Sequence, residues 1–190
     1  MSLNTDVYEN PVNKGEPPET VVMLIGGFFD SFLRIVKGYA EEYRNNNSGR
    51  LVEYFSWTDK DEIISAINST PSSKQIFLVG HSFGAHTAAQ VAAGSSRRID
   101  LLVTVDPVGR RDVGKFTQNV DKWINVTATP ANGNLSDFVA WLGGKGGGLP
   151  VEKAALNFSV DANHEQFAIM FNTTQSGEQS AAQTLQGSTV

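Results

Sequence analysis

The sequence contains no cysteine among its 190 residues, which excludes disulfide bonds, a thiol nucleophile and cysteine-ligated metal sites. Histidine is also scarce, because the chain has only three, and they are too scattered to suggest a catalytic metal cluster. No apolar run approaches the roughly 20 residues that a membrane-spanning helix needs. We therefore expect a protein with no metal, no other cofactor and no stable membrane insertion.

Positive charge is in deficit as well. The formal net charge is -5, and no basic cluster is longer than the pairs Arg97-Arg98 and Arg110-Arg111. This balance disfavours a nucleic-acid partner, which requires a basic patch. The N-terminus lacks the basic start and apolar middle of a signal peptide, so the sequence predicts a cytoplasmic protein. The length and the hydrophobic content of 40% are typical of one soluble globular domain.

Strand and helix patterns alternate between residues 20 and 172, which we expect to form the folded domain. Residues 1–19 are polar and proline-bearing and predict a flexible arm, and residues 173–190 predict a disordered tail. The expected strands are residues 20–26, 50–57, 74–80, 99–106, 123–128 and 155–160. This alternation predicts an α/β fold with a mostly parallel sheet of about six strands and helices on both faces.

The expected helices fill the intervals between these strands. They are residues 30–46, residues 60–69, a segment that starts after Ser82, and residues 163–171. In the first of them, five apolar or aromatic side chains follow a helical spacing and should share the buried face. These are Phe32, Ile35, Val36, Tyr39 and Tyr43.

The segment Gly80-His81-Ser82-Phe83-Gly84 has the pattern G-x-S-x-G and joins a hydrophobic strand to an alanine-rich helix. A turn this sharp strains the serine backbone, and the two glycines leave room for the strand and the helix to approach. The strain points the hydroxyl out of the sheet, toward a helix N-terminus that favours negative charge. These features predict that Ser82 is a nucleophile.

Two further polar side chains follow strands at the same edge of the expected sheet. Asp106 ends the fourth strand, where Pro107 stops it, and His164 follows the last strand. The chain order serine, aspartate, histidine is that of the α/β-hydrolase triad, in which imidazole takes the serine proton and a carboxylate orients the imidazole. His81 points away from its neighbour Ser82, and His86 lies along the next helix, so we assign both structural roles.

Two other carboxylates are alternatives for the triad acid. Many α/β-hydrolases carry the acid one strand later, where this chain has Asp137. Asp161 lies three residues before His164 and is expected at most to shape the turn. Asp106 is favoured because it lies at the tip of a hydrophobic strand next to the serine strand, whereas Asp137 lies within an expected helix.

An oxyanion hole requires two backbone N–H groups aimed at the carbonyl oxygen under attack. One is the amide of Phe83, the residue after the nucleophile. The second should come from the loop after the first strand, where paired glycines at 26 and 27 permit close backbone approach. Asp30 at the end of this loop is a plausible cap for the next helix.

Three segments resemble motifs of the pancreatic-type triglyceride lipases, within the α/β-hydrolase superfamily. They are Gly27-Phe28-Phe29-Asp30, the segment from Gly80 to His86, and Val105-Asp106-Pro107-Val108-Gly109. The resemblance covers residues 20–110 and implies that Phe28 and Phe83 donate the oxyanion N–H groups and that Asp106 is the triad acid. The chain departs from the family in having Gly26 in place of a histidine, in lacking cysteine and in being far shorter.

Residues 132–150 combine an apolar helical segment with a glycine run. This segment is expected to be either a lid at the site or a helix that covers the sheet before the last strand. Four aromatic side chains are candidate substrate contacts. They are Phe29, Trp57, Phe138 and Trp141.

These observations predict a serine hydrolase of carboxylic esters, esterase-like or lipase-like, that works through an acyl-enzyme. Its expected substrate is a small-molecule or lipid ester. Two alternatives stay open: a thioesterase or amidase with the same triad, and a non-catalytic binding protein that retains the fold.

Overall fold

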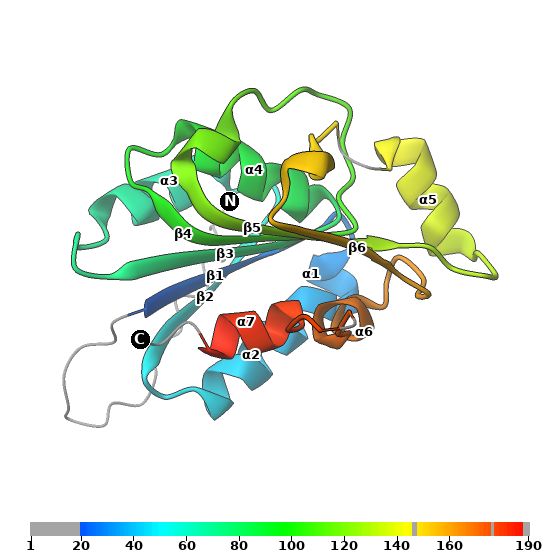
Figure 1. Ribbon diagram of the computed structural model, residues 1–190, viewed down its shortest axis with the longest axis horizontal. Helices are drawn as coiled ribbons and strands as arrows, with labels where there is room; N and C mark the ends of the chain where they lie inside the picture. The colour runs from blue at the N-terminus through cyan, green and yellow to red at the C-terminus, as the bar shows by residue number, and fades with distance from the viewer. Residues whose placement is uncertain (1–19, 146–147, 176, 188–190) are drawn as a thin grey trace.

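The computed structural model describes residues 20–145, 148–175 and 177–187, and a six-stranded parallel sheet forms its centre (Figure 1). The strand order is β2-β1-β3-β4-β5-β6, and every neighbouring pair is parallel. The strands are β1 (Thr20–Gly26), β2 (Arg50–Ser56), β3 (Gln75–His81), β4 (Ile99–Val105), β5 (Val120–Ala128) and β6 (Leu156–Val160). The predicted fold class is confirmed.

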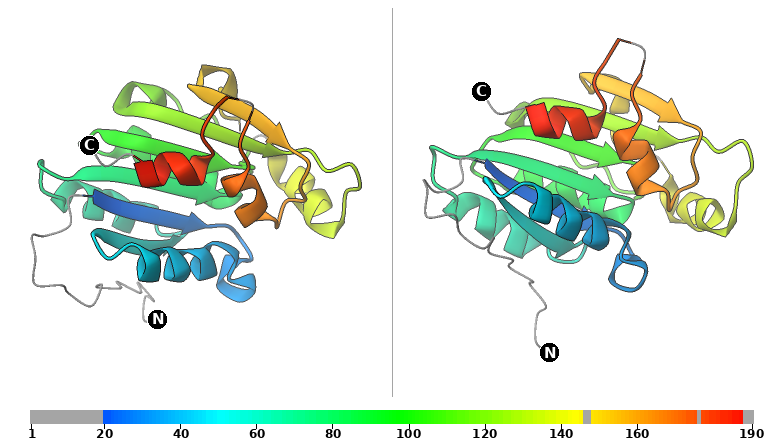
Figure 2. Two further views of the ribbon diagram at one scale, coloured as in Figure 1. Left: turned by 60° about the horizontal axis from the view of Figure 1, so that its bottom comes forward. Right: turned by 90° about the horizontal axis from the view of Figure 1, so that it is seen from below.

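Helices cover both faces of this sheet, as Figures 1 and 2 show. The α-helices are α1 (Asp30–Leu33), α2 (Ile35–Asn46), α3 (Lys60–Ser69), α4 (Phe83–Gly94), α5 (Leu135–Gly144), α6 (Phe167–Asn172) and α7 (Ala181–Gly187), with short 3-10 turns at Phe116–Asn119 and Val151–Lys153. Helices α3 and α4 pack on one face, and α2, α6 and α7 on the other. Because both faces are covered, the central strands β1, β3 and β4 are buried along almost their whole length.

Strand β1 illustrates how the sequence divides between the two cores. Successive side chains of a strand point to opposite faces. Val22 and Leu24 therefore join the core beneath α2, α6 and α7, while Met23 and Ile25 join the core beneath α3 and α4. All seven residues of β1 are buried.

The chain reverses its direction across the sheet between β1 and β3, because β2 lies on one side of β1 and all later strands lie on the other. In open α/β sheets, ligands bind beyond the carboxyl ends of the strands at such a switch point. The turns that follow β1 and β3 meet there, so the topology places the expected nucleophile at the usual ligand-binding position.

The helix expected at 30–46 is divided into α1 and α2 by Arg34, whose φ of 53° lies in the left-handed region. The carboxylate of Asp30 accepts hydrogen bonds from the backbone N–H groups of Val36 (2.6 Å) and Lys37 (3.0 Å), and so caps the start of α2. The break corrects one prediction: Phe32 is turned away from the core and is 84% exposed. A single helical phase cannot extend through a left-handed residue.

The C-terminal segment corrects a second prediction, because part of the tail expected to be disordered is the packed helix α7. Ala181, Ala182 and Leu185 are buried at a helical spacing against the sheet. The side chain of Arg50 donates hydrogen bonds to the carbonyl oxygens of Leu185 and Gln186. The polar composition of the segment conceals this short apolar face, and the fold extends beyond 172.

The expected N-terminal arm, residues 1–19, lies outside the described residues.

Replacement of Leu185 by alanine tests whether α7 belongs to the fold. Leu185→Ala should lower the free energy of unfolding by about 2–5 kcal/mol, because it leaves a cavity in the core. The matched control is Gln186→Ala, which removes an exposed side chain and should change stability by less than about 0.5 kcal/mol. Urea unfolding measures both variants, and equal stability of the two would contradict the packing of α7.

Candidate active site

Three side chains from the carboxyl ends of β3, β4 and β6 form a continuous chain of hydrogen bonds. The Nε2 atom of His164 lies 2.8 Å from the hydroxyl of Ser82, and its Nδ1 atom lies 2.6 Å from Oδ2 of Asp106. A carboxylate can only accept, so Nδ1 carries a proton, and in this tautomer Nε2 can accept from the Ser82 hydroxyl. The structure therefore brings together the serine, histidine and aspartate that the sequence singled out.

The backbone around Ser82 is strained and closely packed. Ser82 has φ 58° and ψ -129°, values that residues other than glycine rarely adopt. A Cβ atom at Gly80 would lie 2.4 Å from the carbonyl oxygen of Gly84, and one at Gly84 would lie 2.2 Å from that of Ile25. The two flanking glycines are therefore required for the close approach of β1, β3 and α4.

The carboxylate of Asp106 is fully buried, and its two oxygens have different partners. Oδ2 accepts from His164, and Oδ1 accepts from the backbone N–H of Ala128 at 3.0 Å. The ammonium group of Lys145 lies 3.8 Å from Oδ1 and donates to the carbonyl oxygen of Ala128 at 2.7 Å. Strand β5 and Lys145 thus hold the carboxylate in place and balance its buried charge.

The other two histidines hold backbone segments. His81 lies beneath the site, and its Nε2 atom donates to the carbonyl oxygen of His164 at 2.7 Å. Burial, followed by the neighbouring His164 ring, lowers the pKa of His81 to about 4, so His81 is neutral at pH 7. Nε2 of His86 lies 2.9 Å from the carbonyl oxygen of Arg111 and anchors the loop after β4.

The alternative acids contact backbone amides instead of the imidazole ring. Oδ1 of Asp137 accepts from the backbone N–H of His164 at 2.9 Å. Oδ1 of Asp161 accepts from the N–H of Ala131 at 2.9 Å and so shapes the turn. Among the three carboxylates considered from the sequence, Asp106 is the one that is hydrogen-bonded to the His164 ring.

The loop after β1 lies directly against the serine. A Cβ atom at Gly27 would lie 2.7 Å from Cβ of Ser82, so glycine is needed at this contact. The next residue is Phe28, whose ring packs near that of Phe83 with 6.4 Å between centroids. Within the described parts of the chain, the backbone N–H groups of Phe28 and Phe83 donate to no protein acceptor.

The glycine at position 26, where the lipase motif has histidine, also has a steric cause. A Cβ atom there would meet Oδ2 of Asp30 at 2.4 Å and the hydroxyl of Tyr54 at 2.5 Å. The Tyr54 phenol and the Asp30 carboxylate occupy the space that a larger side chain would need. Burial, and then the charge of Asp30, raise the pKa of Tyr54, so its hydroxyl stays protonated.

An apolar pocket of about 580 Å³ opens above Ser82, between α5 and residues 27–35, which we call the α1 segment. Its walls come from residues 27–35 on one side and from α5 on the other, with Ser82 and His164 between them. The lining residues are Gly27, Phe28, Phe29, Asp30, Phe32, Leu33, Ile35, His81, Ser82, Phe83, Asn134, Leu135, Ser136, Val139, Ala140, His164 and Glu165.

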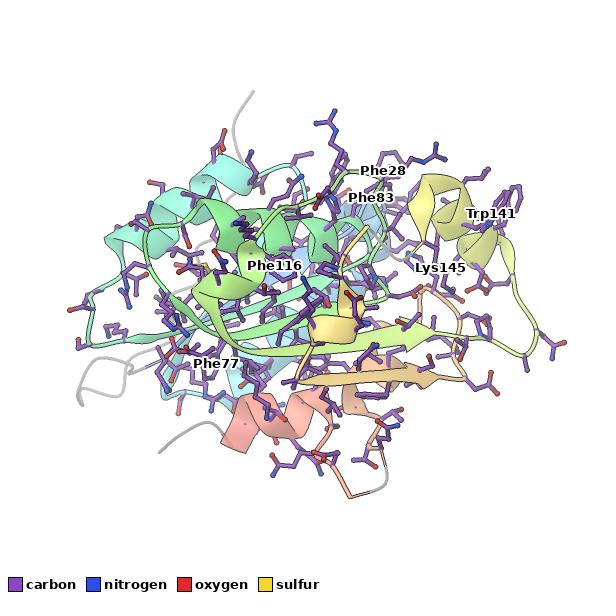
Figure 3. All side chains as sticks on the ribbon, turned by 45° about the horizontal axis from the view of Figure 1, so that its top comes forward. Phe28, Phe77, Phe83, Phe116, Trp141 and Lys145 are labelled. Carbon is purple, nitrogen blue, oxygen red and sulfur yellow. The ribbon has the colours of Figure 1, made fainter. Side chains whose placement is uncertain are left out.

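One of the four predicted substrate contacts, Phe29, lines this pocket, and the other three do not. Trp57 lies behind the pocket-lining residues Phe83 and Phe28, and its ring packs against theirs at centroid distances of 5.3 and 6.0 Å. Phe138 and Trp141 stack on each other on the outer side of α5, and Figure 3 shows Trp141 pointing away from Phe28 and Phe83.

The pocket residues of α5 lie on the helix face that the sequence reasoning passed over. They are Leu135, Ser136, Val139 and Ala140. Their spacing of one and four residues is helical, so the periodicity of the segment could have predicted this shared face. The large aromatic side chains of this helix were predicted instead, and these lie on the opposite face. Helix α5 lies beyond the carboxyl ends of the strands (Figure 1), so it does not cover the sheet.

Neither a family model nor a curated protein matches the sequence. An α/β serine hydrolase without lid from Xanthomonas campestris has a TM-score of 0.55 and 16% identity, over 84% of this chain and 79% of its own. The fluorophosphonate-binding serine hydrolase F of Staphylococcus aureus has a TM-score of 0.49 and 12% identity, over 86% of this chain and 84% of its own. An alpha-beta serine hydrolase homologue from Coxiella burnetii has a TM-score of 0.48 and 15% identity, over 80% of this chain and 79% of its own.

The first of these similarities shows that the chain has the fold of the α/β serine hydrolases. It concerns the fold alone, so the motif resemblance to pancreatic-type lipases stays a prediction. In the described ranges, no three His, Asp or Glu side chains form a possible metal site. No described helix has both the length and the hydrophobicity needed to cross a membrane.

The contact between Gly27 and Ser82 can be tested with two alanine variants. Gly27→Ala should force the loop away from Ser82 and lower the free energy of unfolding by about 1–3 kcal/mol. Gly38→Ala, within α2, has no atom within 4 Å of the added Cβ and should raise stability by about 0.4–1 kcal/mol. Urea unfolding gives both values, and a stable Gly27→Ala protein with an unchanged Ser82–His164 distance would contradict the contact.

Proposed function

We propose that the protein is a serine hydrolase of carboxylic esters that works through an acyl-enzyme. The observation that carries this proposal is the hydrogen-bonded chain from Ser82 through His164 to Asp106 at the base of an apolar pocket. A serine hydroxyl is a weak nucleophile at neutral pH, and this arrangement supplies the base and the orienting carboxylate that activate it.

The geometry supports a two-step reaction. Oγ of Ser82 attacks the ester carbonyl carbon as its proton passes to Nε2 of His164. Asp106 stabilises the imidazolium that forms, and the buried hydrogen bonds to its carboxylate hold it in position. His164 then donates the proton to the departing alkoxide, which leaves the acyl group on Ser82. Water, activated by the same imidazole, releases the carboxylic acid and restores the hydroxyl.

The oxyanion of the tetrahedral intermediate requires donors that are free before the reaction. The backbone N–H groups of Phe28 and Phe83 meet this requirement among the described residues, and the Gly27 contact holds the first of them near Ser82. Phe83 is also the first residue of α4, whose N-terminal dipole favours negative charge. We assign the oxyanion hole to these two amides.

The surroundings of the pocket favour an ester with an apolar acyl group, a lipid ester included. Apart from Ile169, every large hydrophobic side chain that is exposed in the described residues lies on the α1 segment or on α5. These side chains are Phe28, Phe29, Phe32, Leu33, Leu135, Phe138, Val139, Trp141 and Leu142. A concentration of exposed apolar surface around one pocket is typical of a site for an apolar ligand or surface.

Replacement of each triad residue tests the reaction. Ser82→Ala and His164→Ala should each abolish esterase activity without unfolding the protein, and the double variant should be little worse because the residues act as a unit. Asp106→Asn should lower kcat at least about a hundredfold, because asparagine favours the wrong histidine tautomer. The matched control is Asp161→Asn, which should change kcat by less than about tenfold.

A fluorophosphonate probe provides the independent measurement for these variants. It should label the wild-type protein at Ser82 and leave Ser82→Ala unlabelled. Fully additive losses in kcat, or an active Asp106→Asn protein, would contradict the assigned roles. Absence of both labelling and esterase activity would instead support the binding protein that retains the fold.

The apolar pocket predicts a preference for longer acyl chains on soluble esters. The wild-type protein should have a kcat/KM for p-nitrophenyl octanoate at least about tenfold above that for the acetate, because each buried methylene contributes about 0.8 kcal/mol. Val139→Glu, which places a carboxylate in the pocket wall, should remove this preference and leave acetate hydrolysis unchanged. Phe138→Glu is the matched control on the outer face, and equal effects of the two variants would contradict the location of the acyl site.

A further inference from the structure

The first turn of α5 is joined to the loop of His164 by side chains from both segments. Oδ2 of Asp137 accepts from the backbone N–H of Asn134 at 2.8 Å and completes a capping box at the helix start. Oδ1 of the same carboxylate accepts from the backbone N–H of His164 at 2.9 Å. Asp137 therefore connects the pocket wall to the main chain of the proposed general base.

Glu165 makes a second connection between the same two segments. Its carboxylate accepts from the side-chain amide of Asn134 at 2.8 Å and from the hydroxyl of Ser136. Burial raises the pKa of Glu165, but the hydrogen bonds from Ser136 and Asn134 outweigh it and bring the pKa below the usual value, so the group is ionised at neutral pH. These bonds keep the first turn of α5 beside His164.

A capping box needs one oxygen of the carboxylate for the helix start. The bond to His164 is therefore additional to the capping of α5, and it completes the fixation of His164. The ring is hydrogen-bonded to Ser82 and Asp106, the carbonyl oxygen accepts from His81, and the N–H donates to Asp137. Each polar group of the residue has a partner, and these partners come from the end of β3, the end of β4 and the first turn of α5.

Helix α5 has little apolar anchoring of its own. Ala140 is its one buried side chain. Its C-terminal end is tied to the loop after β4, where the N–H of Gly109 donates to the carbonyl oxygen of Gly144 at 2.9 Å. Polar contacts at both ends therefore fix the helix, and those at its N-terminal end are shared with His164.

We propose that Asp137 is a positioning residue for His164. Its bond to the His164 backbone also fixes α5 relative to the general base, so that α5 is a fixed wall of the pocket and not a hinged lid. This inference rests on the proposed function. Asp137 does not contact the substrate; it holds the His164 backbone, so that the imidazole stays aligned between Ser82 and Asp106. The same carboxylate serves the pocket wall and the base, which couples acyl binding to proton transfer.

The test compares Asp137→Ala with Asp137→Asn on p-nitrophenyl acetate, whose short acyl group makes few contacts with α5. Asp137→Ala should lower kcat by about 10- to 100-fold, since a displacement of about 1 Å in a catalytic group has an effect of this size. KM for the acetate should stay within about threefold, because the displaced group carries proton transfer and not binding. Asp137→Asn keeps one acceptor oxygen, so it should retain at least about a tenth of the wild-type kcat and a higher kcat than the alanine variant.

Ser180→Ala is the matched control for the loss of a helix cap. The hydroxyl of Ser180 accepts from the backbone N–H of Gln183 at 3.0 Å at the start of α7, and Ser180 does not line the pocket. This variant should lower the melting temperature, and its kcat should stay within about threefold of wild type. A wild-type kcat in Asp137→Ala, with only a lower melting temperature, would show that Asp137 is merely a cap and would overturn the proposal.

A spectroscopic measurement separates this inference from the proposed function. The proton between Nδ1 of His164 and Asp106 should give a far-downfield NMR resonance in the wild-type protein and in Asp137→Asn. In Asp137→Ala this resonance should weaken or disappear, and an unchanged resonance would overturn the positioning role. The resonance requires no turnover, so it decides the role of Asp137 even if wild-type protein neither hydrolyses esters nor reacts with a fluorophosphonate, a result that would reject the proposed function alone.

Discussion

Close backbone packing around Ser82 is the constraint on which the rest of the site depends. The loop after β1, the end of β3 and the start of α4 approach one another so tightly that Gly27, Gly80 and Gly84 have no room for a Cβ atom. This packing holds Ser82 in a strained conformation, and it places the loop that carries Phe28 against the hydroxyl. The strain is sustained by parallel strands buried on both faces, because such a sheet cannot relax without the loss of core contacts.

The proposed catalytic side chains reach one another because their strands are neighbours in the second half of the sheet. Strands β3, β4, β5 and β6 follow in order, so Ser82, Asp106 and His164 leave the sheet at the same edge. Strand β5 contributes no side chain to the hydrogen-bonded chain but supplies the N–H of Ala128 to Asp106. A buried carboxylate is costly unless it is hydrogen-bonded, and here backbone, imidazole and the nearby Lys145 share that role.

The pocket wall and the base share their supports on the α5 side. Asp137 and Glu165 connect the first turn of α5 to the residues around His164, while the outer face of the helix keeps Phe138 and Trp141 exposed. The helix therefore has an inner face that lines the pocket and an outer face whose large apolar side chains are exposed. The proposed preference for apolar acyl groups follows from the inner face.

The sequence alone determined the features that depend on local sterics and strand order. The serine turn needs glycines at fixed offsets, the alternation of strands and helices defines the sheet, and Asp106 follows a hydrophobic strand that Pro107 stops. Tertiary structure decided the rest. The left-handed Arg34 is stabilised by the cap from Asp30, α7 is ordered by contacts with distant strands, and Asp137 reaches the amide of His164 instead of its ring. The outcomes for α7 and Asp137 depend on contacts between residues far apart in the chain, and the break at Arg34 depends on the geometry of the Asp30 cap. The free energies of these contacts override local propensity.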